Sequence, residues 1–345
     1  MIRSLAAIAL TLGLAGSGRA EELDLFAWSE YVPQDVLDGF TKETGVEVNY
    51  ETYASNEEML AKLLSGAASY DLIQPSEYVV EALVKENRLV RLDHAKLPNL
   101  KNIGRDYWDQ PHDPELDYSV PYMQGTVGIV IDTRKVKDPV TGFGDVFQDK
   151  YKGRIVILND SREIVTWAMA TLGLRPDQFT KENLERVRPI LARWLPLVKV
   201  YDSDSPKTAL LNGDVDLGVV WSGEAAILIR DTREKEPGRF AYVLPKEGAH
   251  MFIDSLAIPK GAAHVETAHR FIDYVLRPDV SRKISAAFPY TNPNVAARDL
   301  LTPAERANPA SYPPGAPKLA TFRDIGPLAA DVDKLVTDLK ARSGP

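Results

Sequence analysis

Apolar and polar positions along the chain predict strands and helices in alternation. The stretch Leu23–Ala27 alternates with the two-residue period of a strand, and the stretch after Pro33 repeats its apolar residues with the period of a helix that ends at Gly45. A second strand, a helix opened by a capping motif, a third strand and a third helix follow at 46–53, 55–64, 70–74 and from 76. This alternation predicts a parallel sheet with right-handed crossovers.

The same pattern returns in the second half of the chain. Arg154–Leu158 reads as a strand that leads into a helix ending near Thr171, and an amphipathic helix is predicted near Ala262–Leu276. Further strands are predicted at 198–201 and 216–221, and a last helix at 328–341. The pattern therefore predicts an α/β fold with two regions, each a mainly parallel sheet flanked by helices.

Two long apolar segments join these regions. Val120–Asp132 is interrupted by Gly125 and Gly128, and Phe252–Pro259 reads as another strand. We interpret both as hinge segments that cross between two lobes; the alternative is that both are interior strands of a single large sheet. The predicted division is an export signal at 1–20, lobe 1 at 21–127 plus 254–298, and lobe 2 at 128–253 plus 299–345.

Length and composition agree with two lobes and exclude some classes of function. A chain of 345 residues exceeds what one hydrophobic core usually supports. Its 49 acidic and 41 basic side chains give a net charge of -8, which argues against a nucleic-acid partner and favours cations. The sequence has no cysteine, so these residues form no disulfide, thiol nucleophile or thiolate metal site.

The N-terminal residues predict export. A basic start at Arg3, an apolar run over Leu5–Ala15 and small residues up to Ala20 are typical of a secretory signal cleaved after Ala20, too short to span a membrane. A lipid anchor needs a cysteine after the signal, and the sequence has none. We therefore expect an exported protein of the periplasm that is not lipid-anchored.

Motifs for metal-dependent or nucleophilic catalysis are missing from the sequence. It contains no His-Glu-x-x-His, no Gly-x-Ser-x-Gly and no Gly-x-x-x-x-Gly-Lys motif. The histidines lack the i, i+4 spacing of a metal pair and are expected at the surface; they are His94, His112, His250, His264 and His269. We expect no metal and no cofactor. Catalysis by paired carboxylates stays open, because acidic residues are plentiful.

Four predicted strands are followed within a few residues by an acidic side chain. Three of these following stretches also contain an aromatic side chain. Ligands of open parallel sheets bind beyond the carboxyl ends of the strands, so these residues are candidates for one shared site. The stretches are Trp28-Ser29-Glu30-Tyr31, Pro75-Ser76-Glu77-Tyr78, Asn159-Asp160-Ser161-Arg162-Glu163 and Trp221-Ser222-Gly223-Glu224.

Each of these stretches also has a purely structural explanation. Asp160 and Glu163 have the spacing of a capping box, and Glu224 falls in a first helical turn, where the helix dipole stabilises a carboxylate. Trp28 and Trp221 fit a hydrophobic core equally well. Their joint recurrence nevertheless favours a cleft for an organic cation, because carboxylates offset the lost hydration of an ammonium and each cation–π contact adds about 0.5–2 kcal/mol. A linear polyamine has the matching alternation of charge and hydrocarbon.

These motifs, with others along the whole mature chain, resemble those of the spermidine/putrescine-binding receptors of bacterial ABC importers. The stretches that carry the resemblance are Trp28–Pro33, Phe40–Gly45, Tyr53–Glu57, Tyr70–Leu72, Asp160–Glu163, Asp254–Pro259, Leu276–Val280 and Pro293–Asn294. The resemblance implies a two-lobe periplasmic binding protein of type II that closes on its ligand and delivers it to an ABC importer permease in the inner membrane.

The resemblance also implies roles for individual residues. The carboxylates that pair with ligand amines are expected to be Glu30, Asp160, Glu163 and Asp254. The aromatic residues around the hydrocarbon are expected to be Trp28, Tyr31, Tyr78, Trp221 and Tyr290, with Ser29 and Ser76 as polar neighbours. Phe252 and Glu224 complete the set, at positions where putrescine-type and spermidine-type receptors differ. The preferred polyamine therefore stays open.

We predict a monomeric receptor for a small polyamine, putrescine or spermidine, that binds by lobe closure and is not an enzyme. One alternative is a receptor for another organic cation, such as a guanidino compound. The other is a secreted carboxylate-dependent hydrolase with Asp160 and Glu163 as acid and base.

Overall fold

The computed structural model describes residues 21–66, 69–315 and 318–343, so the predicted export signal at 1–20 lies outside the described residues. The strands are β1 (Glu22–Trp28), β2 (Glu47–Tyr53), β3 (Leu72–Ile73), β4 (Ser119–Asp132), β5 (Ile155–Ile157), β6 (Val198–Tyr201), β7 (Leu217–Trp221), β8 (Phe240–Val243), β9 (Ala249–Ala257) and β10 (Leu319–Ala320). The helices are α1 (Gln34–Thr44), α2 (Asn56–Ser65), α3 (Glu77–Lys85), α4 (Phe143–Val146), α5 (Ser161–Thr171), α6 (Lys181–Trp194), α7 (Lys207–Asn212), α8 (Ser222–Thr232), α9 (Val265–Val275), α10 (Pro278–Ala287), α11 (Val295–Arg298), α12 (Pro303–Arg306) and α13 (Leu328–Ser343).

The described strands form one mixed, 10-stranded sheet. Its order is β2-β1-β3-β9-β4-β7-β5-β6, with β10 paired to β9 and β8 paired to β4. β1 is parallel to β2 and β3, and β5 is parallel to β6 and β7. The two predicted parallel α/β regions are therefore confirmed. Between them, β4 runs antiparallel to β7, β8 and β9, and β9 runs antiparallel to β3 but parallel to β10.

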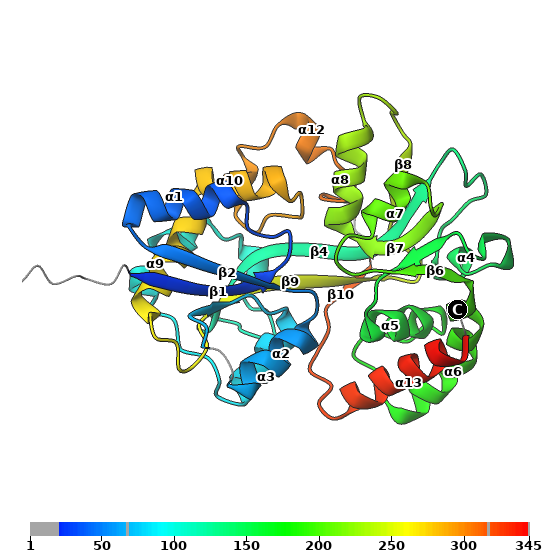
Figure 1. The fold of residues 1–345 in the computed structure, drawn as a ribbon, viewed down its shortest axis with the longest axis horizontal. Coiled ribbons are helices and arrows are strands. Elements are labelled where there is room, and N and C mark those ends of the chain that lie inside the picture. Colours follow the sequence, from blue (N-terminus) through cyan, green and yellow to red (C-terminus); the bar gives the residue numbers. More distant parts are fainter. Residues whose placement is uncertain (1–20, 67–68, 316–317, 344–345) are drawn as a thin grey trace, which may run out of the picture.

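β4 and β9 run from one half of the molecule to the other through its middle (Figure 1). The segment Ser119–Thr126 of β4 pairs with β9, whereas Val127–Ile131 pairs with β7 on the other side of the molecule. The two interpretations of these segments both hold. The strands cross between the two halves, and they are also interior strands of one continuous sheet.

Helices pack on the sheet because each has an apolar face to bury. α1 buries Val36, Leu37 and Phe40, the residues that its sequence spacing places on one face. The terminal helix α13 packs on α5 and α6 and buries Leu335 and Leu339 among its apolar residues. Full burial of a side chain of this size contributes at most about 1.5–3 kcal/mol. None of the described helices has the length and apolar character needed to cross a membrane.

Four strands precede predicted site residues, and they form two pairs, one in each half of the molecule. β1 and β3 end at Trp28 and Ile73 in one half of the molecule, and β5 and β7 end at Ile157 and Trp221 in the other. Both members of a parallel pair have their carboxyl ends at the same edge of the sheet. The segments after these strands therefore gather into two groups, one from each half.

Candidate functional site

The structure brings every residue predicted for the site to one cavity. This cavity has about 700 Å³ of space between protein atoms, and part of it is open to solvent. The predicted residues that line it are Trp28, Ser29, Glu30, Tyr31, Ser76, Tyr78, Asp160, Glu163, Trp221, Glu224, Phe252, Asp254 and Tyr290. They come from both halves of the molecule, so the two groups of strand ends face one another across the same space.

Further lining residues were not predicted from the sequence. They are Ala54, Asn56, Ser203, Asp204, Ile227, His250, Phe288 and Phe322. Asp204 follows β6 in the way that the predicted acids follow their strands, so the strand-end argument extends to it. His250 shares one face of β9 with Phe252 and Asp254, because alternate residues of a strand point to the same side. That alternation is the sequence signal for His250.

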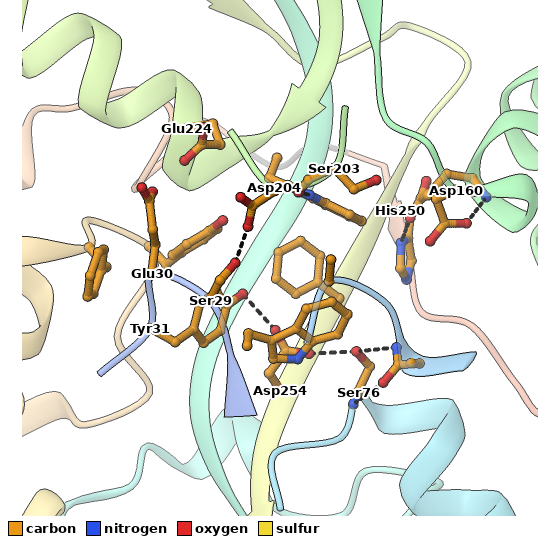
Figure 2. A pocket seen from close by; sticks show the side chains of 18 of the residues that line it. Ser29, Glu30, Tyr31, Ser76, Asp160, Ser203, Asp204, Glu224, His250 and Asp254 are labelled. Carbon is orange, nitrogen blue, oxygen red and sulfur yellow. Dashed lines mark hydrogen bonds and ion pairs between the residues drawn. The ribbon is translucent and has the colours of Figure 1, made fainter. Parts of the chain in front are cut away.

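Asp254 lies in the middle of the cavity (Figure 2). Its carboxylate accepts hydrogen bonds from the Tyr31 hydroxyl at 2.8 Å and from Ser76 Oγ at 2.6 Å. Asn56 Nδ2 in turn donates to Ser76 Oγ at 3.0 Å. Burial raises the pKa of Asp254 to about 7, although the hydrogen bonds from Ser76 and Tyr31 oppose this rise. Asp254 is thus an acid held in place by hydrogen bonds; no lysine or arginine of the described residues forms an ion pair with it, and the charge of His250 lowers its pKa.

At one end of the cavity, the ammonium group of a lysine forms ion pairs with two glutamates. We call Glu30, Lys207 and Glu224 the lysine end. Lys207 Nζ lies 2.7 Å from Glu30 Oε2 and 3.0 Å from Glu224 Oε1. Burial raises the pKa of Glu224 to about 7, and the charge of Lys207 lowers it. Glu30 has a φ of 53°, in the left-handed region that costs a residue other than glycine about 1–3 kcal/mol.

At the other end, a histidine lies between two glutamates; we call Asp160, Glu163, His250 and Glu77 the histidine end. The Nδ1 atom of His250 contacts Glu163 Oε1, and its Nε2 atom lies 3.4 Å from Glu77 Oε1. Burial by itself lowers the pKa of His250, but Glu163 and Glu77 raise it to about 9. His250 is therefore a buried imidazolium.

The expectation that the histidines lie at the surface is wrong for three of them. His112, His250 and His269 are 7%, 5% and 2% exposed, respectively. His250 is buried because carboxylates bind both of its ring nitrogens, and the ring stacks on Phe322 with 3.5 Å between centroids. These partners lie far away in the sequence, so local polarity gives no sign of them.

Asp160 caps a helix and also faces the cavity. Its Oδ1 atom accepts a hydrogen bond of 2.9 Å from the backbone N–H of Glu163 at the start of α5. The predicted capping box is only half formed, because the Glu163 carboxylate binds His250 and Trp167 instead. Burial raises the pKa of Asp160 to about 7, and the charge of Glu57 adds to this rise. Within the described ranges, neither Asp160 nor Asp254 forms an ion pair with a lysine or arginine.

Aromatic rings line the cavity between its two ends. The rings of Trp221 and Phe252 meet edge to face at 5.4 Å, and those of Phe252 and Tyr290 at 6.0 Å. Two glycines make room for these rings. A Cβ atom on Gly125 would lie 2.1 Å from the Phe252 ring, and one on Gly223 would lie 2.2 Å from the Tyr290 ring. Any larger residue at either position would displace a wall of the cavity.

Two features of the cavity determine which ligand fits it: two acids, Asp254 and Asp160, that form no ion pair with a lysine or arginine of the described residues, and flat apolar rings. An ammonium group would offset the charge of Asp254 and Asp160, and a hydrocarbon segment would pack on the rings. In the part of the chain that the structure describes, no group of three or more His, Asp or Glu side chains has a metal-binding arrangement. The acids and rings of the lining thus fit an organic cation.

Comparisons with known proteins agree with this geometry. The chain is 36% identical over 345 residues to the spermidine/putrescine-binding periplasmic protein of Salmonella typhimurium, covering 98% of this chain and 97% of the relative. It is 32% identical over 342 residues to a putrescine-binding periplasmic protein of Pseudomonas aeruginosa, covering 94% and 93%. A solved structure of a spermidine/putrescine ABC transporter substrate-binding protein from Streptococcus pneumoniae has a TM-score of 0.77 at 28% identity, covering 94% of this chain and 99% of that one.

The match to a protein family covers most of the chain. The sequence profile of the family described as bacterial extracellular solute-binding protein matches residues 35–313. These residues include the ends of β3, β5 and β7 and both crossing strands, whereas the end of β1 at Trp28 lies before the matched range. The fold, with two parallel α/β regions joined by antiparallel strands, is that of the two-lobe periplasmic binding proteins. The chain belongs to the family of bacterial extracellular solute-binding proteins.

Proposed function

We propose that this protein is a periplasmic receptor that binds a polyamine in the cavity and delivers it to an ABC importer, with no bond made or broken. The observation that carries the proposal is Asp254, which is 2% exposed and has no basic partner among the described residues. An ammonium group is the ligand that best offsets a buried carboxylate. The names of the relatives, which bind spermidine and putrescine or putrescine, support the same ligand class.

The proposed binding mode is closure of two lobes on the ligand. We propose lobe 1 as residues 21–127 plus 254–298 and lobe 2 as 128–253 plus 299–345. The change of β4 partner, from β9 to β7 after Thr126, supports a boundary there. Contacts that join the two halves, such as that of Ser29 Oγ with Asp204, form when the lobes are near one another. A ligand that touches both lobes favours the closed state by its higher affinity for it.

The proposal includes export of the protein to the periplasm. A signal cleaved after Ala20 would export the chain, and a mature chain without cysteine would stay free of a lipid anchor. The relatives are named periplasmic proteins, which supports the same compartment. We propose that the receptor is a monomer and that its partner is the permease of an importer in the inner membrane.

A ligand screen tests the function. We expect putrescine, spermidine, spermine or cadaverine to raise the thermal unfolding midpoint, because a ligand at 100 times its Kd adds about 2.7 kcal/mol of stability. Mass spectrometry of the bound amine should recover it unchanged. A flat response to all four, with stabilisation by the guanidino compound agmatine, would favour the other-cation receptor. Conversion of the amine would show an enzyme instead.

The affinity of one variant tests the site. We expect Asp254→Asn to weaken polyamine binding by about 2–5 kcal/mol in calorimetry, because the ligand ammonium loses its buried charged partner. The matched control is Asp138→Asn, which removes the same charge from an exposed pair with Lys150. Equal affinities of the two variants would refute the assignment of Asp254.

A further inference from the structure

Lys207 places an ammonium group of the protein itself at one end of the cavity. Its Nζ atom lies within hydrogen-bond distance of Glu30 Oε2 at 2.7 Å, Glu224 Oε1 at 3.0 Å and Ser205 Oγ at 3.0 Å. A lysine ammonium has three N–H donors, so these partners satisfy all of them. The Lys207 side chain is only 15% exposed. The lysine is therefore held against Glu30 and Glu224, which line the cavity, and is not a freely moving surface group.

The contacts of Lys207 are those that a ligand ammonium would make. Glu30 follows β1 in one half of the molecule, and Glu224 lies in the first turn of α8 in the other, so Lys207 bridges the two halves as a ligand would. A second ammonium at this end would lie next to the first, and like charges at such distances repel strongly away from water. Moving Lys207 aside would leave the buried Glu224 without its partner, which is also unfavourable.

The other acids of the cavity differ in whether the protein already neutralises them. Glu163 is paired with His250. Asp204 is exposed and accepts a hydrogen bond from Ser29. Asp254 and Asp160 remain, and within the described residues no lysine or arginine forms an ion pair with either. The protein thus supplies cations to some of its acids and leaves two acids for the ligand.

We infer that Lys207 is a specificity-determining residue: it fills the place of one ligand ammonium, so that the cavity selects a diamine over a triamine. This inference rests on the proposed function, since it names which polyamine the same cavity prefers. The ligand ammonium groups are expected at Asp254 and Asp160, with the hydrocarbon between them on the aromatic rings. The lysine end stays closed by the protein's own cation.

Calorimetry with putrescine and spermidine at one pH and ionic strength tests the inference. Lys207→Met keeps the aliphatic stem and removes the charge, and Lys207→Gln serves as a second uncharged variant. We expect either change to shift the ratio of spermidine to putrescine affinity toward spermidine by about tenfold or more, because a ligand ammonium gains Glu30 and Glu224 as partners. Lys207→Arg keeps the charge and should leave the ratio within about twofold of the unchanged protein.

The control for net charge is Lys199→Met, since Lys199 is exposed on β6 and donates to the backbone oxygen of Asp214. It should leave the affinity ratio unchanged. An unchanged ratio in both uncharged Lys207 variants, or an equal loss of affinity for both amines, would overturn the inference and show that Lys207 only ties the two halves together. Failure of every amine to bind the unchanged protein would instead refute the proposed function, and the inference with it.

Discussion

The two ends of the cavity hold their acids in different ways. At the lysine end, one ammonium from α7 forms ion pairs with two acids, one from each half of the molecule, and the Glu30 side chain is 45% exposed. At the histidine end, a buried imidazolium in the wall contacts both Glu163 and Glu77, each only 1% exposed. Asp160 lies at this same end without a bonded cation among the described residues.

The difference between the two ends indicates at which acids a cationic ligand would gain the most binding free energy. At the lysine end the protein has already provided the cation, so a ligand would have to displace it. Among the described residues, neither Asp160 nor Asp254 forms an ion pair with a lysine or arginine, and burial raises the pKa of each to about 7, although the charges of Arg162 and His250 respectively lower it. A ligand cation at these acids would add a new favourable interaction, whereas at the lysine end it would only replace the interaction with Lys207. Substitutions at the two ends should therefore have unequal consequences.

The largest effect is expected for the histidine in the wall. His250→Leu leaves Glu163 and Glu77 as buried carboxylates without their shared cation, so we expect the free energy of unfolding at pH 8 to fall by about 3–5 kcal/mol. Urea unfolding measures this loss. The comparison variant is His264→Leu, which removes a half-buried imidazole from the buried Asp71; two backbone N–H groups still donate to that carboxylate, so the loss should be smaller than for His250→Leu. Equal losses would show that His250 is not the cation of its end.

The residues on the cavity wall could be predicted from the sequence for a topological reason. Glu30, Asp160 and Glu224 each follow a strand of a parallel pair, and such strands have their carboxyl ends at one edge. The strand-end argument needs only local patterns, which the sequence displays. The crossing segments were likewise visible as long apolar stretches, although the sequence left open whether they crossed between lobes or lay inside one sheet.

The pairing of charges could not be predicted in the same way. Lys207 and Glu30 are 177 residues apart in sequence, and His250 and Glu163 are 87 apart. Which acid meets which base depends on how the two halves come together, and no local pattern records that arrangement. The sequence therefore presents Glu30, Glu163 and Glu224 as equivalent acids. The structure shows that the protein's own cations already occupy them. Their contact with ligand stays a prediction.

A pair of conservative substitutions at opposite ends tests whether acids with and without a protein cation differ in their importance for binding. We expect Asp160→Asn to lower putrescine affinity by about ten- to a hundredfold, because a ligand ammonium loses a charge that no protein cation shares. Asparagine caps a helix as well as aspartate does, so α5 should be preserved. Glu30→Gln should change the affinity by less than about threefold, since Lys207 keeps Glu224. A greater loss for Glu30→Gln would reverse the comparison of the two ends.

A moderate effect is expected from pH, and it has opposite signs for binding and for stability. A ligand ammonium needs Asp254 ionised, and with a pKa of about 7 the ionised fraction falls about tenfold between pH 8 and pH 6, so putrescine affinity should fall by the same factor. The folded-state pKa lies above the unfolded value of about 4, so the ligand-free fold binds more protons in this range and gains about 1 kcal/mol as pH falls from 8 to 6. Calorimetry and urea unfolding at both pH values measure the two trends. Asp254→Asn should make both trends smaller, because one titrating carboxyl is gone; the part that remains is expected from Asp160 and Glu224, whose pKa values burial also raises to about 7. Trends of unchanged size in that variant would show that Asp254 does not titrate in this range.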